Sequence, residues 1–378
     1  MASGIASGNS AERICFVRND RLKEQPFQVW DASDEKQKVR WQELWRSWPK
    51  HDIFAHPDLA AIYAAGGQRA MAVFYKAEKG CILYPFVKRS LGALPWVPRE
   101  LASFCDTTTS YGYGGAYYWG ADEARSRISE LFWKAYDEWA RQERCVSEFI
   151  RFHLFDDDLA AYPGEKVERN ANIVRSLTLT DDALWMDFEH KVRKNIKKAR
   201  RSGLTFLADE NGRYLEDFLR IYDQTMKRRN ASGFYYFGRE YFEALSRSLG
   251  PHKAYFHVLD GGRIVSTELV LYSSQTAYSF LGGTEDEAFD KRPNDLLKYE
   301  IMGWARARGI KNYCLGGGYE PDDGIYRYKL SFAPEGELRF FTGQRVIDEA
   351  RYNELMSARE RFQGGWAPRE GYFPRYRS

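Results

Sequence analysis

The spacing of apolar residues predicts a regular alternation of helices and strands in the first half of the chain. Residues 122–143 carry an apolar face at the helical period of 3.6 residues and form the longest predicted helix. The apolar members of this face are Ile128, Leu131, Phe132, Ala135 and Trp139. The segments before and after it are predicted as a strand at 13–18, helices at 39–48 and 57–66, a hairpin of 69–80 with 81–90, and a strand at 147–155.

The same order of elements recurs in the second half of the chain. The predicted elements are a strand at 204–208, helices at 213–228 and 239–249, a meander of strands at 253–259, 262–273 and 276–283, a long helix at 294–309 and a strand at 311–318. This repetition predicts a pseudo-duplicated α/β (α+β) protein with two similar domains. A single irregular α+β domain is the alternative interpretation.

The domain boundaries follow from this repeat. The first domain is expected at 11–180 and the second at 181–340, with 1–10 disordered. A further strand and helix are predicted after the second domain is complete. They are expected to return to the first domain, at about 341–365.

Composition limits the environment and the partners of the chain. The 378 residues carry a formal charge of only +3, so we expect neither a nucleic-acid coating protein nor a DNA-binding protein. Five scattered cysteines, without zinc spacing, favour a reducing compartment and no metal site. No apolar run is long enough for a membrane span, and the N-terminal residues lack the features of a secretory signal. We therefore expect a cytoplasmic protein without membrane insertion.

A strongly basic segment lies between the two predicted domains. Residues 185–199 have an apolar stripe suited to docking a helix, and cations cover much of the remaining surface. These cations are Lys191, Arg193, Lys194, Lys197, Lys198, Arg200 and Arg201. The segment is interpreted either as a solvated helix face or as a surface for a polyphosphate backbone such as tRNA.

A run of three glycines, Gly316 to Gly318, follows the last strand of the second repeat. A phosphate-binding loop would continue into G-K-[ST] and a helix, whereas here Asp322 and Asp323 follow. The glycines are instead expected to let the backbone turn sharply and approach a substrate without hindrance from a Cβ atom, which makes Gly317 and Gly318 candidate substrate-binding residues.

Four separated motifs carry a resemblance to a known family. "HKVRKNIKKARRSGLTF", "SYGYGG", "RPNDLLKYEIMGWARARGIKNYCLGGG" and "GIYRYKLSFAP" resemble the FemAB-like branch of the GNAT superfamily, over about residues 70–345. This branch includes proteins labelled BioF2-like acetyltransferases. The resemblance implies two GNAT-like domains with mixed sheets flanked by helices. It also implies acyl transfer to an amine.

The resemblance implies roles for particular residues. Tyr328 and Lys329, in "IYRYK", match the family's "LYRFK" pattern at the acyl-transfer centre, where an ammonium would stabilise the negative charge of the transition state. The matching signature of the first domain is "DTTTSYGYGG". Its glycines permit a tight loop and its tyrosines could stack on a base or sugar. The residues concerned are Tyr111, Gly112, Tyr113 and Gly114.

Three acidic or basic residues complete the candidate site. Glu268, an acid within an otherwise apolar strand, is the first candidate for a general base, and Asp106 beside the tyrosine loop is the second. Arg228 could hold a substrate phosphate or carboxylate. Asn294 or Asp295 is expected to cap the helix that follows.

Two donors and one non-enzymatic role remain open from the sequence. In the Fem transferases that the chain resembles, an amino acid moves from aminoacyl-tRNA to an amine of a peptidoglycan precursor; other relatives acylate sugars or antibiotic precursors. An aminoacyl-tRNA donor is favoured by the basic segment and by three carboxylates, Glu285 to Glu287, in place of the usual loop for CoA. An acyl-CoA donor is favoured because the chain lacks the coiled-coil arm of some Fem proteins. A binding module without catalysis is the third hypothesis. No bound cofactor is expected.

Overall fold

The structure is a computed structural model that describes residues 26–64 and 66–378. The strand predicted at 13–18 and the disorder predicted for 1–10 lie outside these described residues. The described residues divide into two compact units, of which the first comprises residues 26–49 together with 54–167 and 341–378. The second comprises 50–53 and 168–340. Among the described helices, none combines the length and apolar character needed to cross a membrane.

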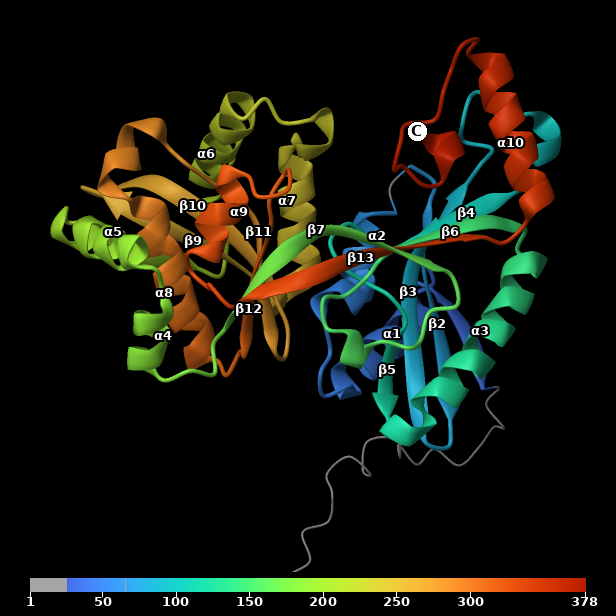
Figure 1. The fold of residues 1–378 in the computed structure, drawn as a ribbon, viewed down its shortest axis with the longest axis horizontal. Coiled ribbons are helices and arrows are strands. Elements are labelled where there is room, and N and C mark those ends of the chain that lie inside the picture. Colours follow the sequence, from blue (N-terminus) through green and yellow to red (C-terminus); the bar gives the residue numbers. More distant parts are fainter. Residues whose placement is uncertain (1–25, 65) are drawn as a thin grey trace, which may run out of the picture. The chain divides into compact units, whose positions relative to one another are not determined.

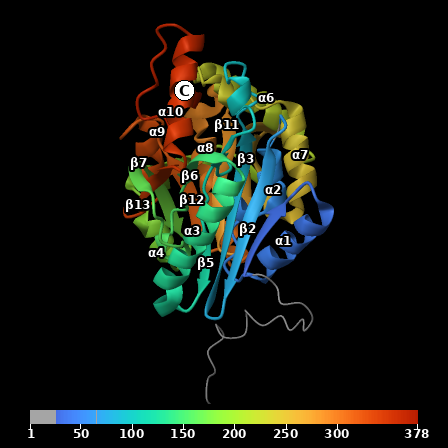
Figure 2. The same ribbon diagram turned by 90° about the vertical axis from the view of Figure 1, so that its right-hand side faces the viewer.

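The first unit is a mixed sheet with helices, coloured blue to teal and red in Figures 1 and 2. Its strands follow the order β1-β2-β3-β4-β6-β13, and β5 pairs with β3. The strands are β1 (Phe27–Asp31), β2 (Arg69–Ala77), β3 (Gly80–Ser90), β4 (Cys105–Thr108), β5 (Tyr117–Gly120), β6 (Cys145–Arg151) and β13 (Glu337–Val346). The α-helices are α1 (Glu35–Ser47), α2 (Pro57–Ile62), α3 (Arg125–Gln142) and α10 (Glu349–Phe362).

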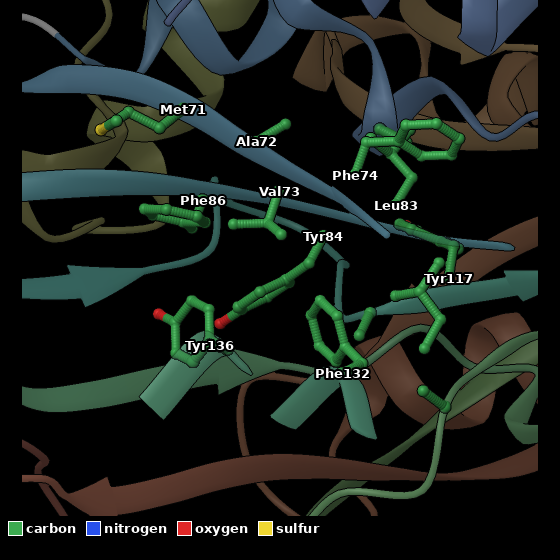
Figure 3. Close-up of a cluster of buried hydrophobic side chains, with 14 of the residues drawn as sticks. Met71, Ala72, Val73, Phe74, Leu83, Tyr84, Phe86, Tyr117, Phe132 and Tyr136 are labelled. Carbon is green, nitrogen blue, oxygen red and sulfur yellow. The ribbon is translucent and has the colours of Figure 1, made fainter. Parts of the chain in front are cut away.

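Aromatic side chains fill the core of the first unit. Figure 3 shows Tyr84 of β3 directed toward Phe132 and Tyr136 of α3, and the Tyr84 and Tyr136 ring centroids are 5.4 Å apart. The Tyr84 hydroxyl reaches a partner, because it donates a hydrogen bond of 2.9 Å to Glu148 of β6. The predicted apolar face of α3 therefore packs on the sheet, with Ile128 and Phe132 buried.

The second unit is a mixed sheet with the strand order β7-β12-β11-β10-β9-β8. Its strands are β7 (Glu165–Ser176), which enters from the first unit, β8 (Thr205–Asp209), β9 (Lys253–Asp260), β10 (Arg263–Tyr272), β11 (Thr276–Thr284) and β12 (Asn312–Gly317). Its α-helices are α4 (Asp181–Asp187), α5 (His190–Arg201), α6 (Leu215–Arg228), α7 (Arg239–Leu249), α8 (Pro293–Ala307) and α9 (Gly324–Leu330).

Helices cover both faces of the second sheet. Consecutive residues of a strand point to opposite faces, and Tyr255 of β9 packs edge-on against Phe218 of α6, with ring centroids 5.0 Å apart. The next residue, Phe256, packs edge-on against Trp304 of α8 at 4.9 Å. Helices α6 and α8 therefore lie on opposite faces. Figure 1 shows α5 beside α8, and a hydrogen bond of 2.8 Å from Arg200 to Glu300 links the two helices.

The predicted elements of both halves are present as helices and strands of a mixed α/β fold, apart from the segment outside the described residues. Helix α7 spans the residues expected for it, Arg239 to Leu249. Four short elements were not predicted, namely β1, β4, β5 and α9, and neither were α4 and the long strand β7. The short elements have only four to seven residues, too few to display a period.

Candidate active site

A cavity of about 1010 Å³ opens within the second unit. Residues of α6, β10, β11, α8 and α9 line it, including the predicted residues Glu268, Tyr328, Lys329 and Arg228. Four candidate residues that are up to 101 positions apart in the sequence are thus brought to one site.

The cavity lies where two neighbouring strands of the sheet separate. Strands β11 and β12 pair in parallel only from Thr276 to Tyr278 on one strand and from Asn312 to Cys314 on the other. Beyond this point β11 continues along the cavity, with Ser279 among the lining residues. Strand β12 instead continues its pairing with β7, after a register shift between Cys314 and Gly316. The cavity thus follows β11 beyond the point where its pairing with β12 ends.

Lys329 is held at the wall of this cavity by the end of β12. Its Nζ atom donates a hydrogen bond of 2.6 Å to the carbonyl oxygen of Gly317. Burial lowers the pKa of Lys329 to about 8, and the positive charge of Lys298 acts in the same direction. The side chain is therefore mainly a cation at neutral pH. Its buried surroundings favour the binding of an anion next to the ammonium group.

Glu268 belongs to a buried network rather than lying free on the cavity wall. Lys298 Nζ lies 2.6 Å from its Oε2 atom, and the Tyr313 hydroxyl donates a hydrogen bond to its Oε1 atom. Lys298 also donates a hydrogen bond of 2.6 Å to the hydroxyl of Ser279. Both carboxylate oxygens are thus engaged, and the charge of Glu268 is balanced by Lys298.

Tyr328 precedes Lys329 on α9 and carries a buried hydroxyl that makes no hydrogen bond. Its ring packs edge-on against Phe332, with centroids 5.2 Å apart. Burial, and then the negative charges of Asp295 and Glu268, raise the pKa of Tyr328 well above its usual value. The hydroxyl therefore stays protonated and has no partner among the described residues, while Tyr328 as a residue lines the cavity.

The first turn of α8 forms another part of the cavity wall. The helix starts at Pro293, and the residue in the N-cap position is Arg292, which has a φ of 64° and makes no capping hydrogen bond. The prediction that Asn294 or Asp295 caps this helix is therefore wrong, because both lie inside the helix. The carboxylate of Asp295 is instead buried and accepts a hydrogen bond of 3.1 Å from Asn195 of α5.

Arg228, at the end of α6, uses its guanidinium within the protein. It pairs with Asp286 and donates a hydrogen bond of 3.2 Å to the carbonyl oxygen of Thr284. Glu285 is similarly paired, with Arg220 and Arg263. The carboxylates of the 285–287 loop are thus largely neutralised by arginines, which the sequence pattern did not reveal.

The glycine run lies behind Lys329, outside the residues that line the cavity. Gly316 has a φ of 78°, in the region that favours glycine. A Cβ atom on Gly317 would lie 2.7 Å from the carbonyl oxygen of Ala171, and one on Gly318 would lie 2.6 Å from a carboxylate oxygen of Asp323. These glycines permit close packing against β7 and α9.

The candidate residues of the tyrosine loop belong to the first unit. Tyr113 packs edge-on against Phe54 at 5.3 Å, and Tyr111 lies 6.3 Å from the ring of Tyr63. Gly112 has a φ of 109°, and a Cβ atom there would lie 2.2 Å from the ring of Phe54. A Cβ atom on Gly114 would lie 2.8 Å from Thr109. The loop thus needs its glycines for internal packing.

Asp106 also lies in the first unit and is fully buried. Arg89 Nε lies 2.6 Å from one of its oxygens and Arg377 Nε lies 2.5 Å from the other. The hydroxyl of Tyr376 donates to it at 2.9 Å. The carboxylate thus joins the C-terminal residues to strand β4.

The basic segment was predicted with one apolar stripe over 185–199, but the structure divides it between α4, which ends at Asp187, and α5, which begins at His190. The apolar face continues as predicted along α5. Val192, Ile196 and Ala199 are buried. Arg193 turns inward and donates hydrogen bonds to the carbonyl oxygens of Met186 and Phe188. Lys191 pairs with Glu189 at 3.2 Å. The side chains of Lys194, Lys197 and Lys198 are exposed, so they form the cationic surface of this helix.

The sequence did not indicate that Lys298 pairs with Glu268, and the expected helix-capping role of Asp295 was wrong. Lys298 and Asp295 both lie in α8, whose apolar residues suggested an ordinary packed helix. The available signal was a lysine at a buried position of that helix, three residues after an aspartate that is also buried. Such a pattern indicates a polar network, because buried charges require partners.

Comparison with known proteins agrees with this geometry. Residues 186–330 match the family described as "Acetyltransferase (GNAT) domain". No curated protein sequence matches the chain.

Several solved structures share the fold. The structure of FemX superimposes with a TM-score of 0.62 at 15% identity, covering 84% of this chain and 98% of FemX. The C-terminal domain of a "Putative Lysylphosphatidylglycerol Synthetase" from Agrobacterium fabrum gives 0.52 at 16% identity, with 88% and 99% covered. L-PGS from Bacillus licheniformis gives 0.50 at 13% identity, with 89% and 98% covered.

The family match lies entirely within the second unit and spans the cavity wall from α6 to α9. Residues 186–330 of the second unit thus match a GNAT acetyltransferase domain, and this match supports an acyltransferase.

Proposed function

We propose that the second unit forms an amide by direct transfer of an aminoacyl group from aminoacyl-tRNA to an amine of a cell-envelope or natural-product precursor. The amine nitrogen attacks the carbonyl carbon of the aminoacyl ester, and the bond from that carbon to the 3′-oxygen of the tRNA breaks. Negative charge develops on the carbonyl oxygen and then on the departing 3′-oxygen, so a fixed cation beside them lowers the barrier.

Lys329 is the group that we assign to this charge. An ammonium has three N–H donors, and one of them is used at Gly317. The remaining donors are available to an oxyanion in the cavity that the side chain lines. The fixed hydrogen bond to Gly317 also orients the ammonium before the substrate arrives, which is what preorganised stabilisation of a transition state requires.

The chemistry of the first turn of α8 is the observation that carries the choice of donor. A helix N-terminus binds a pyrophosphate through free backbone N–H groups. Here Pro293 has no N–H group, and the carboxylate of Asp295 is buried in the same turn. A carboxylate at that place opposes the pyrophosphate of acyl-CoA, whereas the ester end of an aminoacyl-tRNA carries no pyrophosphate.

Two further observations support an aminoacyl-tRNA donor. Lys194, Lys197 and Lys198 form an exposed cationic surface on α5 that suits a polyphosphate backbone. Structures named FemX and L-PGS share the fold, and the Fem transferases that the sequence resembles use aminoacyl-tRNA.

An acyl-CoA donor is the second candidate, acting on an amino sugar or another amine. It is favoured by the description of the matched family as an acetyltransferase domain. Arg229 and Arg292 also line the cavity and are exposed. Their positive charges suit phosphates of either donor.

Donor binding tests this choice without knowledge of the acceptor. We would change Lys194, Lys197 and Lys198 to Gln and titrate tRNA carrying a non-hydrolysable 3′-aminoacyl amide, and separately acetyl-CoA, at two salt concentrations. The variant should bind the tRNA more weakly, with a salt dependence flatter by roughly 0.7 to 0.9 log units per lost phosphate contact. Glutamine preserves the helix, because it is a good helix former.

A matched control changes Lys36, Lys79 and Lys134 to Gln, which removes the same charge from exposed positions of the first unit. The control should bind tRNA as the unchanged protein does. Tight binding of acetyl-CoA together with no measurable binding of the tRNA would reverse the order of the two donors.

A further inference from the structure

A buried carboxylate and a buried hydroxyl on the cavity wall lack the partners that such groups normally have. Asp295 is only 5% exposed, and its carboxylate accepts a hydrogen bond of 3.1 Å from the side-chain amide of Asn195 and one from its own backbone N–H group. In residues 26–64 and 66–378, no Lys or Arg nitrogen pairs directly with it, and the positive charges of Arg292 and Lys191 act on it from a longer distance. The hydroxyl of Tyr328 makes no hydrogen bond. Both residues line the same cavity.

The other two carboxylates of the cavity wall differ in this respect. Glu268 is paired with Lys298 at 2.6 Å. Asp323 caps α9 and accepts hydrogen bonds from the backbone N–H groups of Tyr319, Glu320 and Tyr326, at 2.7, 3.1 and 2.7 Å. The chain therefore supplies an ion pair to Glu268 and three backbone hydrogen bonds to Asp323, whereas it supplies no direct ion pair to Asp295.

Such an arrangement is costly unless a ligand completes it. Burying a charge without a partner opposes folding, and burying a hydroxyl without a hydrogen bond adds to that cost. Asp295 and Tyr328 line one cavity, and the negative charge of Asp295 contributes to the raised pKa of Tyr328. A ligand with a positive charge and several N–H donors would satisfy both.

We propose that Asp295 and Tyr328 form the subsite for the ammonium group of the acceptor, a primary aliphatic amine, a proposal that rests on the proposed function. The Asp295 carboxylate accepts one N–H of the ammonium, and the Tyr328 oxygen accepts another. Asn195 holds the carboxylate in position from α5 and is a positioning residue. Neutral alcohols and anionic nucleophiles do not satisfy this subsite.

The same carboxylate can start the reaction. The acceptor ammonium transfers one proton to Asp295 and becomes a neutral amine, whose electron pair forms the C–N bond to the ester carbon. The nitrogen then loses a second proton to the departing 3′-oxygen as the C–O bond breaks, giving an amide and a 3′-hydroxyl. Asp295 releases its proton to solvent. Burial raises the pKa of Asp295, which suits it to accept the first proton.

Binding of a simple amine tests the subsite without any donor. We would titrate the full chain with n-butylammonium chloride and with 1-butanol, its neutral counterpart, and follow the backbone amide resonances of α8 and α9 by NMR. The unchanged protein should bind butylammonium more tightly than butanol, with shifts centred on these two helices. Asp295→Asn should weaken butylammonium binding by about tenfold or more, the scale of a hydrogen bond to a charged group.

Two more variants separate charge at the subsite from charge in general. Asp290→Asn removes one negative charge from an exposed residue outside the cavity lining, and it should leave butylammonium affinity unchanged. Tyr328→Phe should weaken that affinity by about threefold, and butanol binding should not change in any variant. A circular dichroism melt of each variant checks that it is folded.

Equal affinity for butylammonium and butanol in the unchanged protein would overturn the subsite, and so would an Asp295→Asn variant that binds butylammonium as well as the unchanged protein. Because this titration contains no tRNA and no acyl-CoA, its outcome is separate from that of the proposed function. If the protein binds the amine through Asp295 but does not use aminoacyl-tRNA, the result supports the subsite and contradicts the assignment of the donor.

Discussion

The ammonium nitrogen of Lys329 lies 2.6 Å from the carbonyl oxygen of Gly317, which ties helix α9 to the end of strand β12. Gly316, whose φ is 78°, lies at the register shift that turns β12 away from its partner β11. The glycine run thus supports the lysine twelve residues later. Its role is to fix a cation beside the gap between two strands.

Replacing Gly317 by Ala tests this supporting role. The added Cβ atom would lie 2.7 Å from the backbone oxygen of Ala171, so β12 or β7 must shift. We expect a loss of about 1–3 kcal/mol in the free energy of unfolding, measured by urea denaturation. Gly303→Ala, in the interior of α8 and with no atom within 4 Å of the new Cβ, is the matched control. It should stabilise by up to about 1 kcal/mol, and a Gly317→Ala variant as stable as the control would contradict the packing described for β12.

The two tyrosines of the cavity region should respond in opposite ways to loss of the hydroxyl. Tyr313→Phe removes a hydrogen bond to the buried carboxylate of Glu268 and should destabilise the fold by about 1–3 kcal/mol. Tyr328→Phe removes a hydroxyl that has no partner, so the free energy of unfolding should stay the same or rise. Thermal and urea denaturation of both variants would measure this. A large destabilisation by Tyr328→Phe would mean that its hydroxyl is bonded in the free protein.

The stability of the protein should depend on the ionisation of Lys329. Burial lowers the folded-state pKa to about 8 from an unfolded value of 10.5. Between these values the unfolded chain binds more protons, so this group makes the folded state more stable as the pH rises. Below about pH 8 the cost of burying the charge is fully present. Lys329→Met removes this dependence. As the pH rises from 7 to 10, the free energy of unfolding of the unchanged protein should therefore increase relative to that of the variant. A difference independent of pH would show that the lysine has its ordinary pKa.

The rate of catalysis should also depend on the ionisation of Lys329, but it should fall as the pH rises. The protonated form of Lys329 stabilises the oxyanion, so the single-turnover rate should fall as the pH rises through about 8. The acceptor in this experiment must be a weakly basic amine that is neutral across the whole range, because a more basic acceptor would gain reactivity as it deprotonates. In Lys329→Met the residual rate should show no such fall. If the decline near pH 8 persists in the variant, another group is responsible for it.

The sequence predicted the elements of the fold because the apolar periodicity of its long segments is strong. Helix α7 and the apolar stripe of α5 through Val192, Ile196 and Ala199 are present as expected. Helix α9 was not predicted, because its seven residues are too few to show a period and its N-cap, Asp323, follows a glycine-rich turn. Short elements of this kind depend on capping and tertiary contacts, which a single sequence does not display.

The candidate site was predictable only in part, for a related reason. Lys329, Tyr328 and Glu268 were found because a motif or an acid within an apolar strand marked them, and all three line one cavity. The partner that balances Glu268, Lys298, was hidden within an amphipathic helix, where a lysine is ordinarily solvated. The pairing of the 285–287 carboxylates with Arg220, Arg228 and Arg263 was hidden as well. Contacts between residues far apart in the chain decide whether a charge is free, and they cannot be read from the spacing of residues along one sequence.

Transfer of a labelled acyl group to an amine is the most direct test of the central claim, that Lys329 promotes aminoacyl transfer from tRNA in the cavity of the second unit. We would supply tRNA charged with a labelled amino acid, or labelled acetyl-CoA, together with a panel of primary amines that includes cell-envelope precursor peptides and amino sugars. Single-turnover formation of labelled amide would be measured for the unchanged protein and for Lys329→Met, which keeps the apolar stem and deletes the ammonium. The account predicts amide from the charged tRNA and a loss of about 100-fold or more in the variant, the scale of removing one oxyanion stabiliser. Amide formed from acetyl-CoA and not from charged tRNA, or a Lys329→Met variant that works within a few-fold of the unchanged protein, would contradict it.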